Sequence, residues 1–168
     1  MKLLLSTICV VTLGSAGLAA QNRPDFSGTW NMDLARSESA AQGTPIKSVT
    51  VAIRQTPGEI RIETTRDGST ELARYLLSAE KPAGSQEQVG LFRWDGPRLV
   101  TTLVIDINSR PITVQEIRSL SASGTEMTVE INVAVEHGYQ TSGSNAARSQ
   151  SVSNASKGTN VFVKAGSR

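Results

Sequence analysis

Apolar residues along most of this chain alternate with polar ones, with a period of two. The longest run spans 126–137, and shorter runs lie at 49–54, 60–65 and 98–107. A period of two is typical of a β-strand with one buried and one exposed face. Sheets with one dry and one wet face are built mainly by antiparallel pairing, so the pattern predicts an all-β protein.

Short turn signals separate these runs. They are Pro57-Gly58, Asp67-Gly68, Asp95-Gly96-Pro97 and Ser123-Gly124, and Asp-Gly is a favoured two-residue hairpin turn. The alternation and the turns together predict strands at 27–34, 46–55, 59–66, 70–79, 88–95, 98–107, 112–121, 126–137 and 159–165. The pattern leaves open one further strand near 147–153.

Strands joined in sequence by tight turns predict an antiparallel meander of eight to ten strands. Such a meander has to hide its edges, and closure into a barrel is the usual solution. A two-sheet β-sandwich is the alternative. Residues 138–159 are rich in Ser, Asn, Gly and Ala and predict a flexible loop within the single domain at 20–168.

The first nineteen residues are predicted to be a secretory signal peptide. Lys2 precedes an apolar run, and small residues follow it, so that cleavage is expected after Ala19 or Ala20. The run is shorter than the ~20 residues that span a bilayer. We therefore expect an exported bacterial protein, periplasmic or extracellular, with no integral membrane span after cleavage. The single cysteine, Cys9, would leave with this leader, so the mature chain would form no disulfide.

The charged residues point to no catalytic, metal or nucleic-acid site. There are 17 basic and 15 acidic side chains and one histidine, His137. A nucleic-acid binder would carry a clustered basic excess, and common zinc sites use several His or Cys ligands. We therefore expect no enzyme, no cofactor, no metal and no nucleic-acid partner. Arginines of the strand region are expected to pair with acids on the outer face, the alternative being an anion-binding interior: Arg54, Arg61, Arg66, Arg74, Arg93 and Arg118, with Glu63, Glu71 and Glu116.

Two motifs carry a family resemblance. Residues 23–30 read RPDFSGTW, and residues 93–100 read RWDGPRLV. The first resembles the Gly-x-Trp signature of lipocalins, and both are similar to motifs of uncharacterised secreted bacterial proteins that open with D-F-S-G-T-W. Classical lipocalins carry a C-terminal helix and usually disulfides, and this chain shows neither, which favours a looser lipocalin-like barrel.

The resemblance implies structural roles for both motifs. Gly28, Thr29 and Trp30 would close one end of the barrel, with Trp30 under the side chain of Lys164 or Arg118. Trp94, Asp95 and Gly96 would form the second hairpin motif. A barrel of this kind identifies a fold and leaves its ligand open.

The apolar face of the strands supplies the candidate lining of a ligand cavity: Val51, Ile53, Ile62, Leu103, Ile105, Val129, Ile131 and Val133. We therefore expect a binding protein for a small apolar or amphipathic molecule, which would require a cavity above ~300 Å³. The alternative is a protein-interaction or protease-inhibitor-type barrel that engages an extracytoplasmic protein through its loops, above all 138–159.

Overall fold

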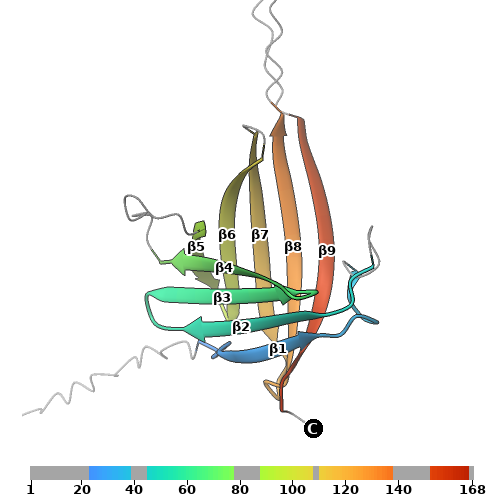
Figure 1. The fold of residues 1–168 in the computed structure, drawn as a ribbon. Coiled ribbons are helices and arrows are strands. Elements are labelled where there is room, and N and C mark those ends of the chain that lie inside the picture. The colour runs from blue at the N-terminus through green and yellow to red at the C-terminus, as the bar shows by residue number, and fades with distance from the viewer. Residues whose placement is uncertain (1–22, 39–44, 78–87, 108–109, 138–151, 167–168) are drawn as a thin grey trace, which may run out of the picture.

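A computed structural model describes residues 23–38, 45–77, 88–107, 110–137 and 152–166, which form nine strands. The first four are β1 (Gly28–Met32), β2 (Val49–Gln55), β3 (Glu59–Arg66) and β4 (Ser69–Leu76). The other five are β5 (Gln88–Asp95), β6 (Arg98–Ile107), β7 (Arg110–Leu120), β8 (Glu126–His137) and β9 (Val152–Lys164). Figure 1 shows their arrangement.

The strands form one closed barrel in chain order, with β9 paired to β1. The predicted all-β barrel is confirmed, and the sandwich alternative is wrong. Among the described strands, every pairing but one is antiparallel, and the exception is the parallel pair β4–β5. Strand direction cannot alternate around a ring with an odd number of members. Closure of nine strands therefore requires a parallel pair, which a purely antiparallel meander does not contain.

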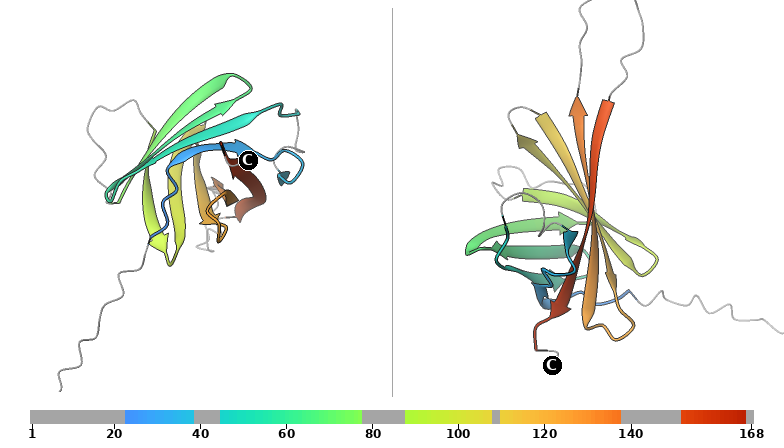
Figure 2. Two further views of the ribbon diagram at one scale, coloured as in Figure 1. Left: turned by 90° about the horizontal axis from the view of Figure 1, so that it is seen from below. Right: turned by 90° about the vertical axis from the view of Figure 1, so that its right-hand side faces the viewer.

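The barrel is taller on one side. β6 to β9 have 10 to 13 residues each, whereas β1 to β5 have 5 to 8. Figures 1 and 2 show β1–β4 lying across the lower parts of β6–β9, whose upper parts extend beyond them. One barrel end therefore opens against a wall made by the longer strands.

The predicted start of the last strand is wrong. β9 begins at Val152 rather than at 159, so residues 152–159 are strand and not part of a loop. They pair with the upper part of β8, from His137↔Val152 to Glu130↔Thr159. The small and polar residues of this segment carry no alternating pattern in the sequence. The segment is a strand because its backbone pairs with that of β8. The rest of the predicted loop, 138–151, and the predicted leader lie outside the described residues.

The lower end of the barrel is filled by the first motif. Trp30 is fully buried, and its indole Nε1 donates a hydrogen bond to the backbone oxygen of Phe26 at 2.9 Å. Lys164 Nζ lies 5.3 Å from the centroid of the Trp30 ring, within the range of a cation–π contact. The structure thus places Lys164, and not Arg118, over Trp30. Gly28 has φ +130°, and a Cβ there would lie 3.1 Å from Cε of Lys164.

The second motif packs against the same end. The ring of Trp94 lies 6.1 Å from that of Phe26, centroid to centroid, and the guanidinium carbon of Arg23 lies 5.6 Å from the Trp94 ring centroid. Asp95 forms an ion pair with Arg98 across the turn. Both motifs therefore close the lower end, and neither lines the open one. Within the described residues, no helix is long and apolar enough to cross a bilayer.

Candidate functional site

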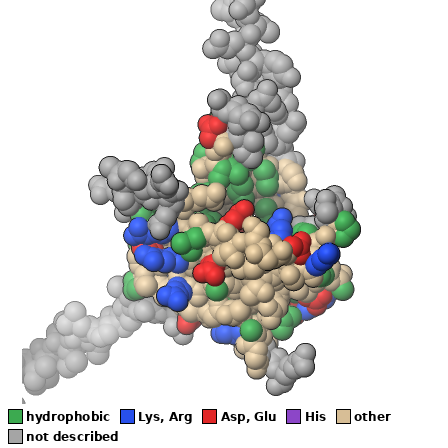
Figure 3. Space-filling view, viewed as in Figure 1, with side chains coloured by type: hydrophobic (Ala, Val, Ile, Leu, Met, Phe, Trp, Pro, Cys, Tyr) green, Lys and Arg blue, Asp and Glu red, His purple; other side chains and the backbone are tan. Residues whose placement is uncertain are grey.

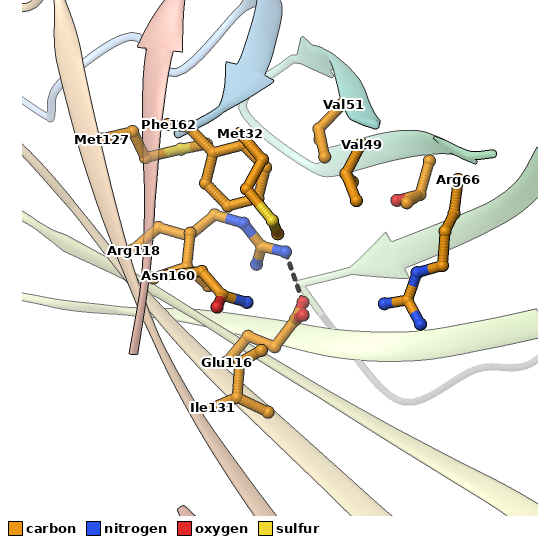
Figure 4. Close-up of a pocket in the computed structure, with 12 residues that line it drawn as sticks. Met32, Val49, Val51, Arg66, Glu116, Arg118, Met127, Ile131, Asn160 and Phe162 are labelled. Atoms are coloured by element: carbon orange, nitrogen blue, oxygen red, sulfur yellow. Dashed lines mark hydrogen bonds and ion pairs between the residues drawn. The ribbon is translucent and has the colours of Figure 1, made fainter. Parts of the chain in front are cut away.

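A pocket opens into the barrel between the short strands and the taller wall (Figure 4). Its cavity volume is about 70 Å³, and all the empty space between the lining atoms, open solvent included, is about 430 Å³. The apolar lining comes from β1, β2, β8 and β9: Met32, Val49, Val51, Met127, Val129, Ile131 and Phe162. The polar lining comes from β3, β7 and β9: Thr64, Arg66, Glu116, Arg118 and Asn160.

Strand register stacks the interior residues of β6, β7 and β8 in rows from the floor of the pocket upward. Above the interior Leu120–Met127 pair, the first row joins Leu99, Arg118 and Val129, and the second joins Thr101, Glu116 and Ile131. The third row joins Leu103, Val114 and Val133, and above it Ile105 pairs with Ile112. The two rows that contain polar residues therefore lie directly above the Leu120–Met127 pair, and two apolar rows lie above them.

Arg118 is the central polar residue of the floor. Its side chain is 4% exposed, and its Nη2 forms an ion pair with Oε2 of Glu116. Nη1 donates a hydrogen bond to Oγ1 of Thr101 at 2.7 Å. The buried Nε has no hydrogen-bond partner. Positions 116 and 118 share a face because side chains alternate along a strand, and that face is the interior.

Tyr75 extends this polar network to β4. It is 5% exposed and hydrogen-bonded to Thr101. Burial, and next the negative charge of Glu116, raise the pKa of Tyr75 to about 12, although Arg118 and the bond to Thr101 act in the opposite direction. Tyr75 is therefore a neutral phenol at physiological pH, and it supplies a hydroxyl rather than a charge.

Arg66 enters the pocket from the opposite side. It pairs in register with Val49, which lines the pocket, so both side chains share the interior face of the barrel. Figure 4 shows its guanidinium pointing into the pocket across from the Glu116–Arg118 pair. Within the described part of the chain, Arg66 forms no ion pair. Asn160, which is buried on β9, completes the polar floor.

The apolar rows form an open wall above the floor. Ile105, Ile112, Val114 and Val133 are each only partly buried. Figure 3 shows hydrophobic side chains gathered on the upper part of the molecule, above the crossing strands. The pocket therefore leads from a charged interior to a partly exposed apolar surface.

The predicted cavity lining divides into three groups. Val51, Val129 and Ile131 line the pocket. Ile53, Ile62 and Leu103 are buried in the core. Ile105 and Val133 lie on the wall above.

The polar half of the site was predicted only as the alternative to outer-face pairing, an anion-binding interior with Arg66 and Arg118 among its residues. Glu116 and Arg118 share the parity of Ile112, Val114 and Leu120 in β7. Two opposite charges between the apolar positions 114 and 120 of one strand face indicate an interior ion pair, and this signal is present in the sequence. The expectation that arginines pair on the outer face holds for Arg61 and Arg74, but their partner is Glu59. For Arg118 it is wrong.

The described residues contain no group of acidic, His or Cys side chains that could hold a metal ion. His137 is the last residue of β8, and its side chain lies outside the described part. The pocket lining contains one carboxylate, Glu116, which Arg118 already engages. A pair of free acid and base groups is therefore not assembled by the lining residues.

No protein-family model matches this chain, and no curated protein matches it. Its fold is similar to that of apo lipid binding protein 8 (LBP-8) from Caenorhabditis elegans, with a TM-score of 0.45 and 11% identity over 83% of this chain and 94% of that one. It is also similar to a point mutant of the fluorescent protein UnaG, with a TM-score of 0.42 and 11% identity over 83% of this chain and 96% of that one.

Proposed function

We propose that this protein binds a small amphipathic molecule at the open end of its barrel, outside the cytoplasm. The polar end of the ligand occupies the pocket above Arg118, and its apolar part lies on the wall of β6, β7 and β8. The observation that carries the proposal is the order of the rows, with buried polar groups at the floor and partly exposed apolar side chains directly above. The first nineteen residues, with their signal-peptide pattern, support the location.

The size of the pocket corrects the idea of a wholly enclosed ligand. The cavity volume of about 70 Å³ falls far short of the ~300 Å³ expected for a cavity that buries a whole small molecule. It is large enough for a head group or for a few water molecules, each of which needs about 10–15 Å³ by this measure. The apolar part of the ligand therefore has to rest on the wall.

Binding is a better proposal than catalysis for this pocket. General acid–base chemistry needs titratable groups that can give and take protons at the substrate. Glu116 is held by Arg118, and burial keeps Tyr75 protonated. The alternative of a protein-binding barrel depends on loop 138–159, of which 152–159 are strand, and no described contact favours it.

A series of straight-chain 1-alkanols of increasing length tests the proposal, with affinity measured by isothermal titration calorimetry. Each methylene that reaches the wall should add up to ~0.8 kcal/mol of binding free energy, and the gain should stop where the wall ends. Amide chemical shifts in ¹⁵N-labelled protein should change along β6–β8. Absence of binding at every chain length, or shift changes confined to another surface, would contradict the proposal.

A matched pair of variants locates the apolar contact. Val133→Thr keeps the side-chain shape and introduces a hydroxyl on the wall, whereas Val104→Thr makes the same change on the outer face, where Val104 is 60% exposed. We expect Val133→Thr to weaken alkanol binding by about 1 kcal/mol. Val104→Thr should bind as the unmodified protein does. Equal effects of the two variants would show that the wall is not the binding surface.

A further inference from the structure

The three charged residues of the pocket specify the head group of the ligand, an inference that rests on the proposed function. We infer that the head group is a single negative charge, such as a carboxylate, received between Arg66 and Arg118. Glu116 is then a built-in counter-ion that occupies part of the same guanidinium and limits the affinity for the ligand anion.

The charge of the lining favours an anion. Two guanidinium groups and one carboxylate leave the pocket with a net positive charge. Tyr75 adds no charge, and Glu71, which is next to Thr64 in register, is neither a lining residue nor an ion-pair partner of Arg66. A cationic head group would add a further positive charge beside the buried Arg118, where the low dielectric makes such a contact costly.

Arg118 has donor capacity that its protein partners do not use. A guanidinium carries five N–H donors in a planar fork that fits a carboxylate. Thr101 and Glu116 engage Nη1 and Nη2, and the buried Nε has no partner. A buried donor without a partner costs free energy that an oxygen acceptor would recover. The unused donor therefore indicates a ligand oxygen at the floor of the pocket.

Arg66 supplies the second contact from the facing strand. It forms no ion pair with any described acid, and its guanidinium points into the pocket opposite Glu116 and Arg118 (Figure 4). Arg66 is exposed at the mouth, so it can move to meet a ligand without losing an ion pair. An anion between Arg66 and Arg118 would form ion pairs on both sides of the pocket. A neutral head group would form an ion pair with neither guanidinium.

Three ligands with one alkyl chain test the inference: decanoate, 1-decanol and decylamine at neutral pH, each titrated by calorimetry below its aggregation concentration. Decanoate should bind at least tenfold more tightly than 1-decanol, and decylamine should bind most weakly. Glu116→Gln keeps an oxygen acceptor for Arg118 and removes the competing charge, so it should tighten decanoate binding about tenfold and increase the ratio of decanoate to 1-decanol affinity.

Arg66→Gln should weaken decanoate binding about tenfold, whereas Arg54→Gln, an exposed arginine on the outer face of β2, is the matched control. Thermal unfolding of each variant shows that it is folded. If 1-decanol and decanoate bind equally and Glu116→Gln changes neither, the inference is overturned and the proposed function stands. Preference for decylamine, or weaker decanoate binding by Glu116→Gln, also overturns it. If none of the three ligands binds, the proposed function fails as well.

Discussion

Gly90 in β5 lies at the parallel pair, where the closure of the barrel can be tested directly. It is the register partner of Tyr75 in β4, and the Tyr75 ring packs over its backbone. A Cβ at Gly90 would lie 2.4 Å from the backbone oxygen of Thr102 and 2.7 Å from Cδ1 of Tyr75. Contacts of a real Cβ stay above 3.0 Å, so β5 or β6 would have to move by at least 0.6 Å. Because the closest atom belongs to the backbone of β6, a side-chain rotation cannot relieve the clash.

We therefore expect Gly90→Ala to lower the free energy of unfolding by about 1–3 kcal/mol, the usual cost of overpacking a core. A loss of ~2 kcal/mol lowers Tm by roughly 4–8 °C in a domain of this size. Urea denaturation followed by tryptophan fluorescence measures the change, provided that the slope of the transition is unaltered.

Gly58→Ala is the control for Gly90→Ala. Gly58 lies in an exposed turn, and a Cβ there would meet no atom within 4 Å. This substitution should leave stability unchanged or raise it by ~0.4–1 kcal/mol, because alanine restricts the unfolded chain. If Gly90→Ala were as stable as Gly58→Ala, Tyr75 would not pack over β5, and the parallel pairing of β4 with β5 would be refuted.

Three further predictions concern the segment that follows β1, the interior of the barrel and its closed end. Ser37→Ala should cost about 1–3 kcal/mol in urea denaturation, because the buried Ser37 hydroxyl satisfies both a backbone N–H (3.0 Å) and a backbone oxygen (3.3 Å) of β9; an unchanged midpoint would contradict this role. With Tyr139 replaced by Phe, ultraviolet titration should show Tyr75 ionising near the pKa of about 12 that burial gives it. Since that value is above the ~10 of the unfolded chain, its contribution to stability is complete below pH ~10 and is lost as the pH rises toward 12. Lys164→Met should lower stability by roughly 0.5–1 kcal/mol through the lost contact with the Trp30 ring, and no loss would argue against that contact.

The sequence allowed most of the strands to be predicted because an alternating pattern is a local property. The run at 126–137 coincides with β8, and the hairpin at Asp95-Gly96 joins β5 to β6 as its turn residues indicate. The direction of β5 relative to β4 is not a local property. It is tied to the odd number of strands in the closed ring. The sequence between 77 and 88 does not indicate how many strands the barrel has. The early start of β9 was hidden for a similar reason, since the Ser, Asn and Lys residues there carry no apolar signal.

The two halves of the site differ in the same way. The apolar wall could be predicted from parity alone, and Val129, Ile131 and Val133 lie on the interior face as their alternation requires. The charged floor depends on which strand faces which across the barrel. Arg66 and Arg118 are far apart in the sequence, on β3 and β7, and only closure of the barrel brings them to one pocket.

The cost of the Glu116–Arg118 pair links the fold to the proposed function. Removing two charges from water costs several kcal/mol per ion, and the attraction between them often fails to recover it. A well-packed apolar pair in the same rows would stabilise the barrel at least as well, and the neighbours of Arg118 in its row, Leu99 and Val129, are already buried apolar residues. The lower end of the barrel needs no such pair, because Trp30 fills it and the charge of Lys164 lies over the indole ring. An ion pair that does not improve packing, and that leaves one donor unsatisfied beside an open pocket, is better explained by what enters the pocket than by the stability of the barrel.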